Sequence, residues 1–167
     1  LALGYDSTRV RLADNTVKEW GRMPNGNVVT QPTTVSGLTD AVQVASSFDA
    51  ACARRATGGV SCWGNTSNWG GSGNVVSTPV AVTFPSGNVT HITLGQGWGC
   101  GQRGMAVDCF GYNYAGQFGN GTSGNIVGPT NTGLLTTKVF AGGLHSCKFN
   151  QYYGAVDCAG YNWDGQL

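Results

Sequence analysis

Several features that are common in globular proteins are missing or scarce in this 167-residue sequence. No apolar run approaches the roughly 20 residues that a transmembrane helix needs, and no stretch repeats apolar residues at helical spacing over three turns. Acidic residues number 8 and basic residues 9, so the formal net charge is only +1. This balance argues against a surface that binds nucleic acid. We therefore expect no membrane span in this stretch and no nucleic acid among its partners.

What the sequence has in quantity is glycine, with 28 residues, together with many valines, threonines and asparagines. Valine and threonine favour strands, whereas glycine and asparagine favour tight turns. The composition therefore predicts an all-β protein built from short strands.

Six cysteines reveal an internal repeat. They form three pairs, whose first members are 48 and 47 positions apart and whose second members are 47 and 49 positions apart: Cys52/Cys62, Cys100/Cys109 and Cys147/Cys158. An earlier copy, around residues 16–21, has no cysteine but places Trp20 in the register of Trp63. The chain thus reads as a single array of about three and a half repeats of about 48 residues, with approximate bounds 1–44, 45–93, 94–140 and 141–167, the last one incomplete.

Each complete copy also contains a turn rich in glycine and asparagine, followed by a strand led by a proline: Pro32, Pro79 or Pro129. Repeats made only of strands cannot bury their apolar faces alone, so neighbouring copies must stack. Radial stacking into a β-propeller protects the strand edges best. A straight β-solenoid is the alternative, although its coils are usually shorter than ~48 residues. We expect the copies to be propeller blades.

The motifs of the repeat carry a family resemblance. Residues 141–147 read Ala-Gly-Gly-Leu-His-Ser-Cys, residues 60–64 read Val-Ser-Cys-Trp-Gly, and residues 160–167 read Gly-Tyr-Asn-Trp-Asp-Gly-Gln-Leu. This pattern resembles the regulator of chromosome condensation repeat over essentially the whole chain, although Ala50 and Trp98 stand where the fourth copy has His145. The resemblance implies a seven-bladed propeller, of which this chain would supply about half a ring. Either a longer parent chain or further copies of the chain would complete it.

The cysteine pairs do not have the spacing of metal ligands, because their members are 10, 9 and 11 positions apart. The two cysteines of each pair flank a hairpin turn and would face each other across adjacent strands. We predict a disulfide within each blade; free buried cysteines are the alternative. In the first copy the two registers hold Arg9 and Glu19, which predicts a cross-strand ion pair in place of the disulfide.

Persistent disulfides indicate an oxidising compartment, so the expected localisation is extracellular or at the cell surface. Three Asn-x-Ser/Thr sequons, at Asn65, Asn88 and Asn120, are candidate N-glycosylation sites. Sequons also arise by chance in a chain so rich in asparagine, serine and threonine, and N-glycans require an organism that glycosylates its proteins.

No constellation of residues indicates catalysis. The two histidines are His91, which has no evident partner, and His145, whose repeat position indicates a structural role. Asp108 and Asp157 share one register, but the other copies hold different polar residues there, as expected of a solvated strand face. We predict no catalytic residue, no metal site and no cofactor, and hence a protein that is not an enzyme.

Four aromatic residues occupy equivalent turns of the third and fourth copies, two in each: Tyr112, Tyr114, Tyr161 and Trp163. Exposed aromatic rings stack on sugars and anchor protein partners. The alternative interpretation is that these rings pack between blades.

Three functions follow from these observations. The first is a non-enzymatic extracellular module, structural or protein-binding, whose partner is another protein or copies of itself. The second, implied by the resemblance, is an intracellular regulator like the founding family member, which promotes guanine-nucleotide exchange on a small GTPase and docks on chromatin. The third is a carbohydrate-binding propeller that uses the turn aromatics on glycans. The paired cysteines and the neutral charge favour the first.

Overall fold

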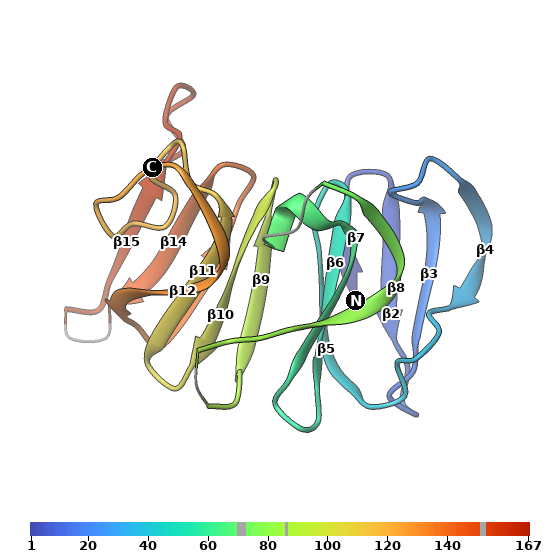
Figure 1. The fold of residues 1–167 in the computed structure, drawn as a ribbon. Helices are drawn as coiled ribbons and strands as arrows, with labels where there is room; N and C mark the ends of the chain where they lie inside the picture. Colours follow the sequence, from blue (N-terminus) through green and yellow to red (C-terminus); the bar gives the residue numbers. More distant parts are fainter. Residues whose placement is uncertain (70–72, 86, 151–152) are drawn as a thin grey trace.

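The computed structural model describes residues 1–69, 73–85, 87–150 and 153–167, which form four antiparallel sheets (Figure 1). Each sheet is a meander whose strands follow one another in chain order. Sheet A contains β1 (Ala2–Leu3), β2 (Ser7–Arg11), β3 (Val17–Arg22) and β4 (Val28–Thr34); sheet B contains β5 (Ala41–Ser46), β6 (Ala50–Arg55), β7 (Val60–Asn65) and β8 (Val75–Val82). Sheet C contains β9 (His91–Gly95), β10 (Trp98–Arg103), β11 (Ala106–Tyr112) and β12 (Asn125–Leu135); sheet D contains β13 (Lys138–Ala141), β14 (His145–Asn150) and β15 (Ala155–Gly160).

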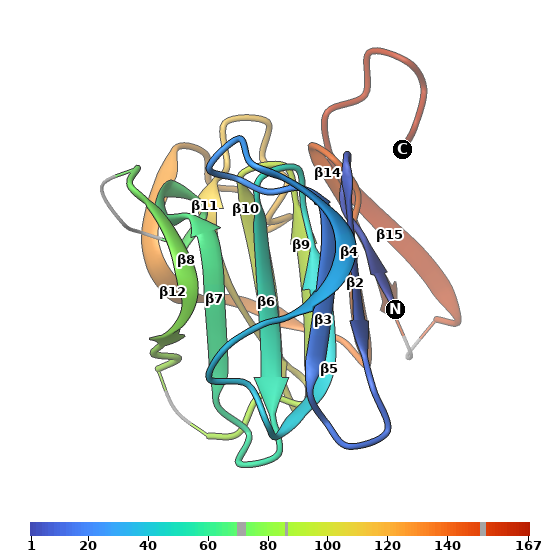
Figure 2. The same cartoon turned by 90° about the vertical axis from the view of Figure 1, so that its right-hand side faces the viewer.

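The four sheets stand side by side as the blades of a partial propeller ring, and Figure 2 shows the same arrangement from the side. The first strands of neighbouring blades are in contact, β5 with β9 and β9 with β13, whereas β4, β8 and β12 are edge strands of their sheets. The repeat bounds expected from the sequence, at 44/45, 93/94 and 140/141, each fall inside the first strand of a blade, in β5, β9 and β13.

The outer edge strands hold the repeated prolines. Pro32, Pro79 and Pro129 lie in the middle of β4, β8 and β12, and not at the start of a strand as the sequence analysis expects. An edge strand tolerates proline because one of its sides has no hydrogen bonds to form. The strand can therefore begin several residues before the proline.

A register shift recurs where the third strand of the first three blades pairs with the fourth, and a glycine follows it. In sheet B this residue is Gly64, whose φ of 102° lies in the left-handed region. A Cβ at Gly64 would lie 2.3 Å from the carbonyl oxygen of Asp49. The repeated glycine therefore meets a backbone requirement of the bulge.

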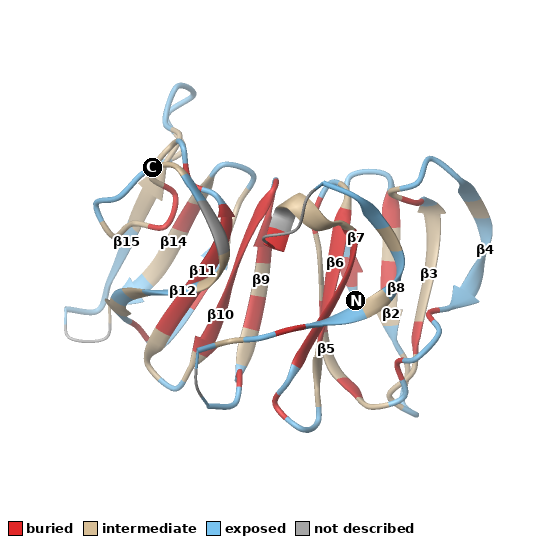
Figure 3. Ribbon diagram, in the orientation of Figure 1, coloured by how far each residue is buried: buried red, intermediate tan, exposed pale blue. Residues whose placement is uncertain are grey.

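The cores lie between the blades. Trp63, Val17 and Leu38 fill the space between sheets A and B; Cys62, Ile92 and Phe110 fill that between B and C; Trp98, Phe118 and Val139 fill that between C and D. Burial is accordingly heaviest on the strands of sheets B and C, as Figure 3 shows. Within the described residues, the sole helix is the short 3-10 turn η1 (Thr66–Trp69), and no helix is long and apolar enough to cross a bilayer.

Candidate functional site

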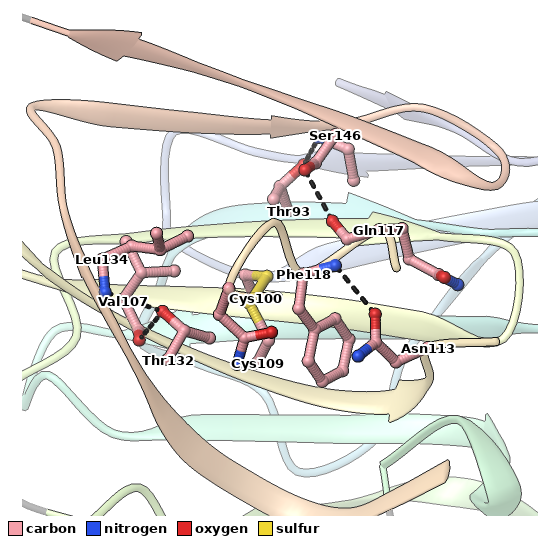
Figure 4. Close-up of a disulfide and its surroundings, with 12 residues drawn as sticks. Thr93, Cys100, Val107, Cys109, Asn113, Gln117, Phe118, Thr132, Leu134 and Ser146 are labelled. Carbon is pink, nitrogen blue, oxygen red and sulfur yellow. Dashed lines mark hydrogen bonds between the residues drawn. A yellow bond between two sulfur atoms is a disulfide. The ribbon is translucent and has the colours of Figure 1, made fainter. Parts of the chain in front are cut away.

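Three disulfides link the second and third strands of sheets B, C and D. Cys52–Cys62, Cys100–Cys109 and Cys147–Cys158 join residues that lie directly opposite each other, with Cα atoms 4.0 to 4.1 Å apart. The first two disulfides are buried between blades, whereas that of sheet D is half-buried. Figure 4 shows Cys100–Cys109 beside Phe118 and the turn that follows β11. Each disulfide therefore ties a hairpin inside one blade.

In sheet A, Arg9 and Glu19 occupy the two cysteine registers and face each other across β2 and β3. Arg9 Nε donates to Glu19 Oε2 over 3.1 Å, and the Arg9 side chain is 1% exposed. The same carboxylate oxygen accepts the Trp63 indole N–H of sheet B at 3.0 Å. Burial lowers the pKa of Arg9, and the carboxylate of Glu19 partly offsets this. The pair thus links two blades, which a disulfide within one blade does not do.

The sequon asparagines differ in what their side chains do. The Asn65 amide nitrogen donates to Asp49 Oδ2 at 2.9 Å, and its Oδ1 accepts from Ser67. Asn120 is half-buried and its Oδ1 accepts from Thr122. Asn88 is exposed. Of the three asparagines, Asn88 is the most exposed.

The histidines lie in separate places. His145 is the first residue of β14, and its ring occupies the space that a Cβ at Gly142 would need. The Trp98 ring does the same at Gly95 in the preceding blade. His91 lies 3.1 Å from the Gln43 amide nitrogen through its Nδ1 and contacts Phe140 edge-on. Burial lowers the pKa of His91, and the positive charges of Lys138 and Arg54 lower it further.

The aspartates of the shared register require a correction. Asp108 is completely buried and accepts two hydrogen bonds from the Arg103 guanidinium, one of them at 2.9 Å. The burial shows that Asp108 does not lie on a solvated strand face. Its charge is tolerated there because Arg103 on the neighbouring strand neutralises it. Asp157, on sheet D, is exposed. No group of three His, Cys, Asp or Glu side chains within the described part of the chain is placed to hold a metal ion.

The four turn aromatics line an apolar groove of about 730 Å³ between sheets C and D. We call this site the aromatic groove; it is lined by Tyr112, Tyr114, Ala115, Gln117, Leu144, Gly160, Tyr161, Asn162 and Trp163. Tyr112 and Tyr114 have ring centroids 6.0 Å apart with planes at 35°, and Tyr161 and Trp163 have centroids 5.2 Å apart with planes at 34°. Two tilted pairs of rings therefore flank one opening.

The outer ring of each pair is open to solvent. Tyr114 is 73% exposed and Trp163 is 86% exposed, so these rings do not pack between blades. The registers of Tyr112 and Tyr114 hold Arg22 and Pro24 in the first copy. The scaffold itself therefore does not require aromatic residues at these positions.

Buried polar side chains fix the turn that carries the rings. Asn113 is fully buried; its Oδ1 accepts the Phe118 N–H at 2.9 Å, and its Nδ2 donates to the Thr122 carbonyl at 2.9 Å. Gln117 donates to the Tyr112 carbonyl at 2.7 Å and accepts the Ala115 N–H at 3.1 Å. Figure 4 shows the hydrogen bond between the Phe118 nitrogen and the Asn113 oxygen, with Gln117 beside it.

The fourth copy repeats this scheme. Asn162 Oδ1 accepts the Leu167 N–H at 3.0 Å, and Gln166 Oε1 accepts the Asp164 N–H at 3.1 Å. The Ser146 hydroxyl of sheet D also donates to the Gln117 carbonyl at 2.6 Å, which joins the two sides of the groove. Sequence reasoning missed Leu144 and the supporting amides; the recurrence of Asn and Gln at fixed offsets from Gly111 and Gly160 was the available signal.

Comparison with known proteins supports the fold. No protein-family model and no curated protein matches the chain. Among solved structures, it is similar to Prp20p, the RCC1 protein of Saccharomyces cerevisiae, with a TM-score of 0.81 and 19% identity over 96% of this chain and 44% of that one. Human WBSCR16 gives a TM-score of 0.82 and 21% identity over 99% of this chain and 48% of that one.

The ectodomain of the receptor kinase CR4 from Physcomitrella patens gives a TM-score of 0.61 and 19% identity over 98% of this chain and 40% of that one. The chain thus spans less than half the length of these three structures. At such identities the likeness concerns the fold: the chain has the β-propeller fold of the regulator of chromosome condensation proteins, as a partial ring of blades.

Proposed function

We propose that the chain is a non-enzymatic extracellular module that binds a protein partner through the aromatic groove. The observation that carries this proposal is the pair of exposed rings, Tyr114 and Trp163, on turns whose backbone N–H groups donate to the amide side chains of Asn113 and Asn162. Rigid, exposed aromatic side chains lose little entropy on binding and recur among the residues that dominate interface energetics.

The three disulfides support the extracellular part of the proposal, because cytosolic thiols are kept reduced. The CR4 ectodomain shows that a fold of this kind occurs in a receptor's extracellular part. Prp20p, by contrast, has been studied with Gsp1p and histones, and Kap60 has been crystallised with it. The alternative function, an intracellular exchange factor, would place the six cysteines where thiols are kept reduced. Counting free thiols therefore distinguishes the two functions.

A screen against an array of secreted and cell-surface ectodomains tests the proposal. The wild-type chain is compared with Tyr114→Ala/Trp163→Ala and with the control Tyr153→Ala, since Tyr153 is 83% exposed but does not line the groove. We expect the double variant to bind a wild-type partner at least about 30-fold more weakly, because interface hot spots contribute about 2 kcal/mol or more. Equal binding by both variants would place the interface elsewhere.

A further inference from the structure

The polar groups of the aromatic groove are mostly hydrogen-bond donors without a partner. Within the described residues, the hydroxyls of Tyr112, Tyr114 and Tyr161 and the indole N–H of Trp163 make no hydrogen bond. The amide of Gln117 is different, because both of its polar atoms are used by the turn backbone. A ligand would therefore meet apolar ring faces and free O–H and N–H groups.

Charge is absent from the lining of the groove. None of its nine residues is acidic or basic. A charged ligand segment would lose hydration here without gaining an opposite charge, so the groove favours a neutral ligand. Its volume of about 730 Å³ lies in the range of sites that hold a compact ligand or a short segment.

Two neutral ligand classes have apolar faces that stack on aromatic rings: sugars and proline-rich peptides. A sugar presents hydroxyls that donate as well as accept; phenolic oxygens accept such hydrogen bonds, but ionised carboxylates form stronger, charge-assisted ones. The groove has no carboxylate, and the Oδ1 of Asn162 and the Oε1 of Gln117 already accept backbone N–H groups. A proline-rich segment presents pyrrolidine rings and carbonyl acceptors, and proline has no N–H to satisfy.

We propose that the aromatic groove binds a neutral, proline-rich segment of the partner protein in the polyproline II conformation. This inference rests on the proposed function. One turn of that helix is three residues and about 9 Å long, and aromatic-lined grooves recognise it through ring stacking and hydrogen bonds to its carbonyls. Tyr112, Tyr114 and Tyr161 supply hydroxyl donors, and Trp163 supplies the indole donor.

Titration of the isotope-labelled chain followed by NMR tests this inference. The probes are acetylated decaproline, a set of ten-residue Pro-x-x-Pro peptides with uncharged x, a Gly-Ser peptide of equal length, and the neutral sugars cellotriose and chitotriose. We expect proline peptides to shift the Trp163 indole resonance and the Gly-Ser peptide to leave it unchanged. Raising the salt concentration from 50 to 500 mM should change the affinity less than about twofold, because no ion pair is formed.

Variants assign the site and separate this inference from the proposed function. Tyr114→Ala should weaken proline-peptide binding at least about tenfold, whereas Tyr153→Ala should leave it unchanged. The inference is overturned when no proline peptide shifts Trp163, or when the sugars do so in their place. If the proline peptides fail but Tyr114→Ala/Trp163→Ala still loses the ectodomain partner of the wild-type chain, the proposed function stands and only the class of ligand is wrong.

Discussion

At the scale of single residues, the pair Arg9 and Glu19 shows how one repeat position accepts two chemistries. The register that holds a disulfide in sheets B, C and D holds an ion pair in sheet A between the buried Arg9 and the half-buried Glu19, and Glu19 also accepts the Trp63 indole N–H. A buried charge is tolerated only with a partner at hydrogen-bonding distance. The stability of sheet A therefore depends on both members of the pair.

Glu19→Gln should destabilise the chain by about 3 kcal/mol, because Arg9 then stays buried without a counter-charge. Arg9→Cys/Glu19→Cys should form a fourth disulfide, since the two positions are in register. Urea unfolding and thiol counting under oxidising conditions measure both effects. Unchanged stability of Glu19→Gln, or a double variant that stays reduced, would contradict this account.

His91 should make the chain less stable in mild acid. Because its pKa is lowered in the folded state, the unfolded chain binds the proton first as the pH falls below about 6.5. The free energy of unfolding should therefore be highest above this pH and fall as the pH is lowered toward the pKa of the folded state. NMR titration of the His91 ring checks the direction of the shift, and His91→Gln should remove this part of the pH dependence. A midpoint above 6.5 would show the sign to be wrong.

At the scale of elements, the disulfides tie hairpins whose strands already pair. Each closes a loop of about 10 residues, for which the chain-entropy model gives about 2–3 kcal/mol. Cys52–Cys62 and Cys100–Cys109 lie in the buried spaces between blades, whereas Cys147–Cys158 is half-buried on the last blade.

A reductant should therefore open Cys147–Cys158 first. Access to the sulfur atoms controls the rate of thiol–disulfide exchange, and the other two disulfides are shielded by neighbouring blades. Alkylation with mass spectrometry after brief reduction gives the order. Opening of Cys100–Cys109 before Cys147–Cys158 would mean that sheets C and D are packed less tightly than in this structure.

The strand pairs and disulfides were predictable from the sequence because period, cysteine spacing and turn residues all encode local geometry. The strand bounds around Pro32, Pro79 and Pro129 were not predictable from the sequence. A strand continues through a proline only at the edge of a sheet, and the order of strands in the whole sheet decides which strands are at the edge. The burial of Asp108 was missed for a similar reason, since its partner Arg103 comes from the neighbouring strand. The sequence pattern identified the four aromatic residues of the groove. It did not predict the groove, because the groove forms only where sheets C and D pack side by side.

At the scale of the whole molecule, the outer face of sheet D differs from its counterpart on sheet C. Val107 on sheet C is fully buried against sheet D, whereas Val156, at the same register of sheet D, is 64% exposed. Phe149 lies opposite Val156 and is also exposed. An apolar face of this kind is suited to packing against another sheet.

The isolated chain should therefore self-associate, and Phe149→Lys/Val156→Lys should make it monomeric. Sedimentation velocity over a range of concentrations measures this. Val28→Lys is the control, because Val28 is exposed on the edge strand β4 and should leave association unchanged. A wild-type chain that stays monomeric at high concentration would contradict the prediction.

The central claim, that this propeller is an extracellular binding scaffold, is tested most directly by non-reducing peptide mapping of the protein from its native source. The account predicts three disulfides, Cys52–Cys62, Cys100–Cys109 and Cys147–Cys158, and no free thiol. The same spectra show whether the sequon asparagines carry glycans, and we expect any glycan on Asn88, the most exposed of the three. Six free thiols with three unmodified asparagines would contradict the account and make an intracellular regulator the better explanation.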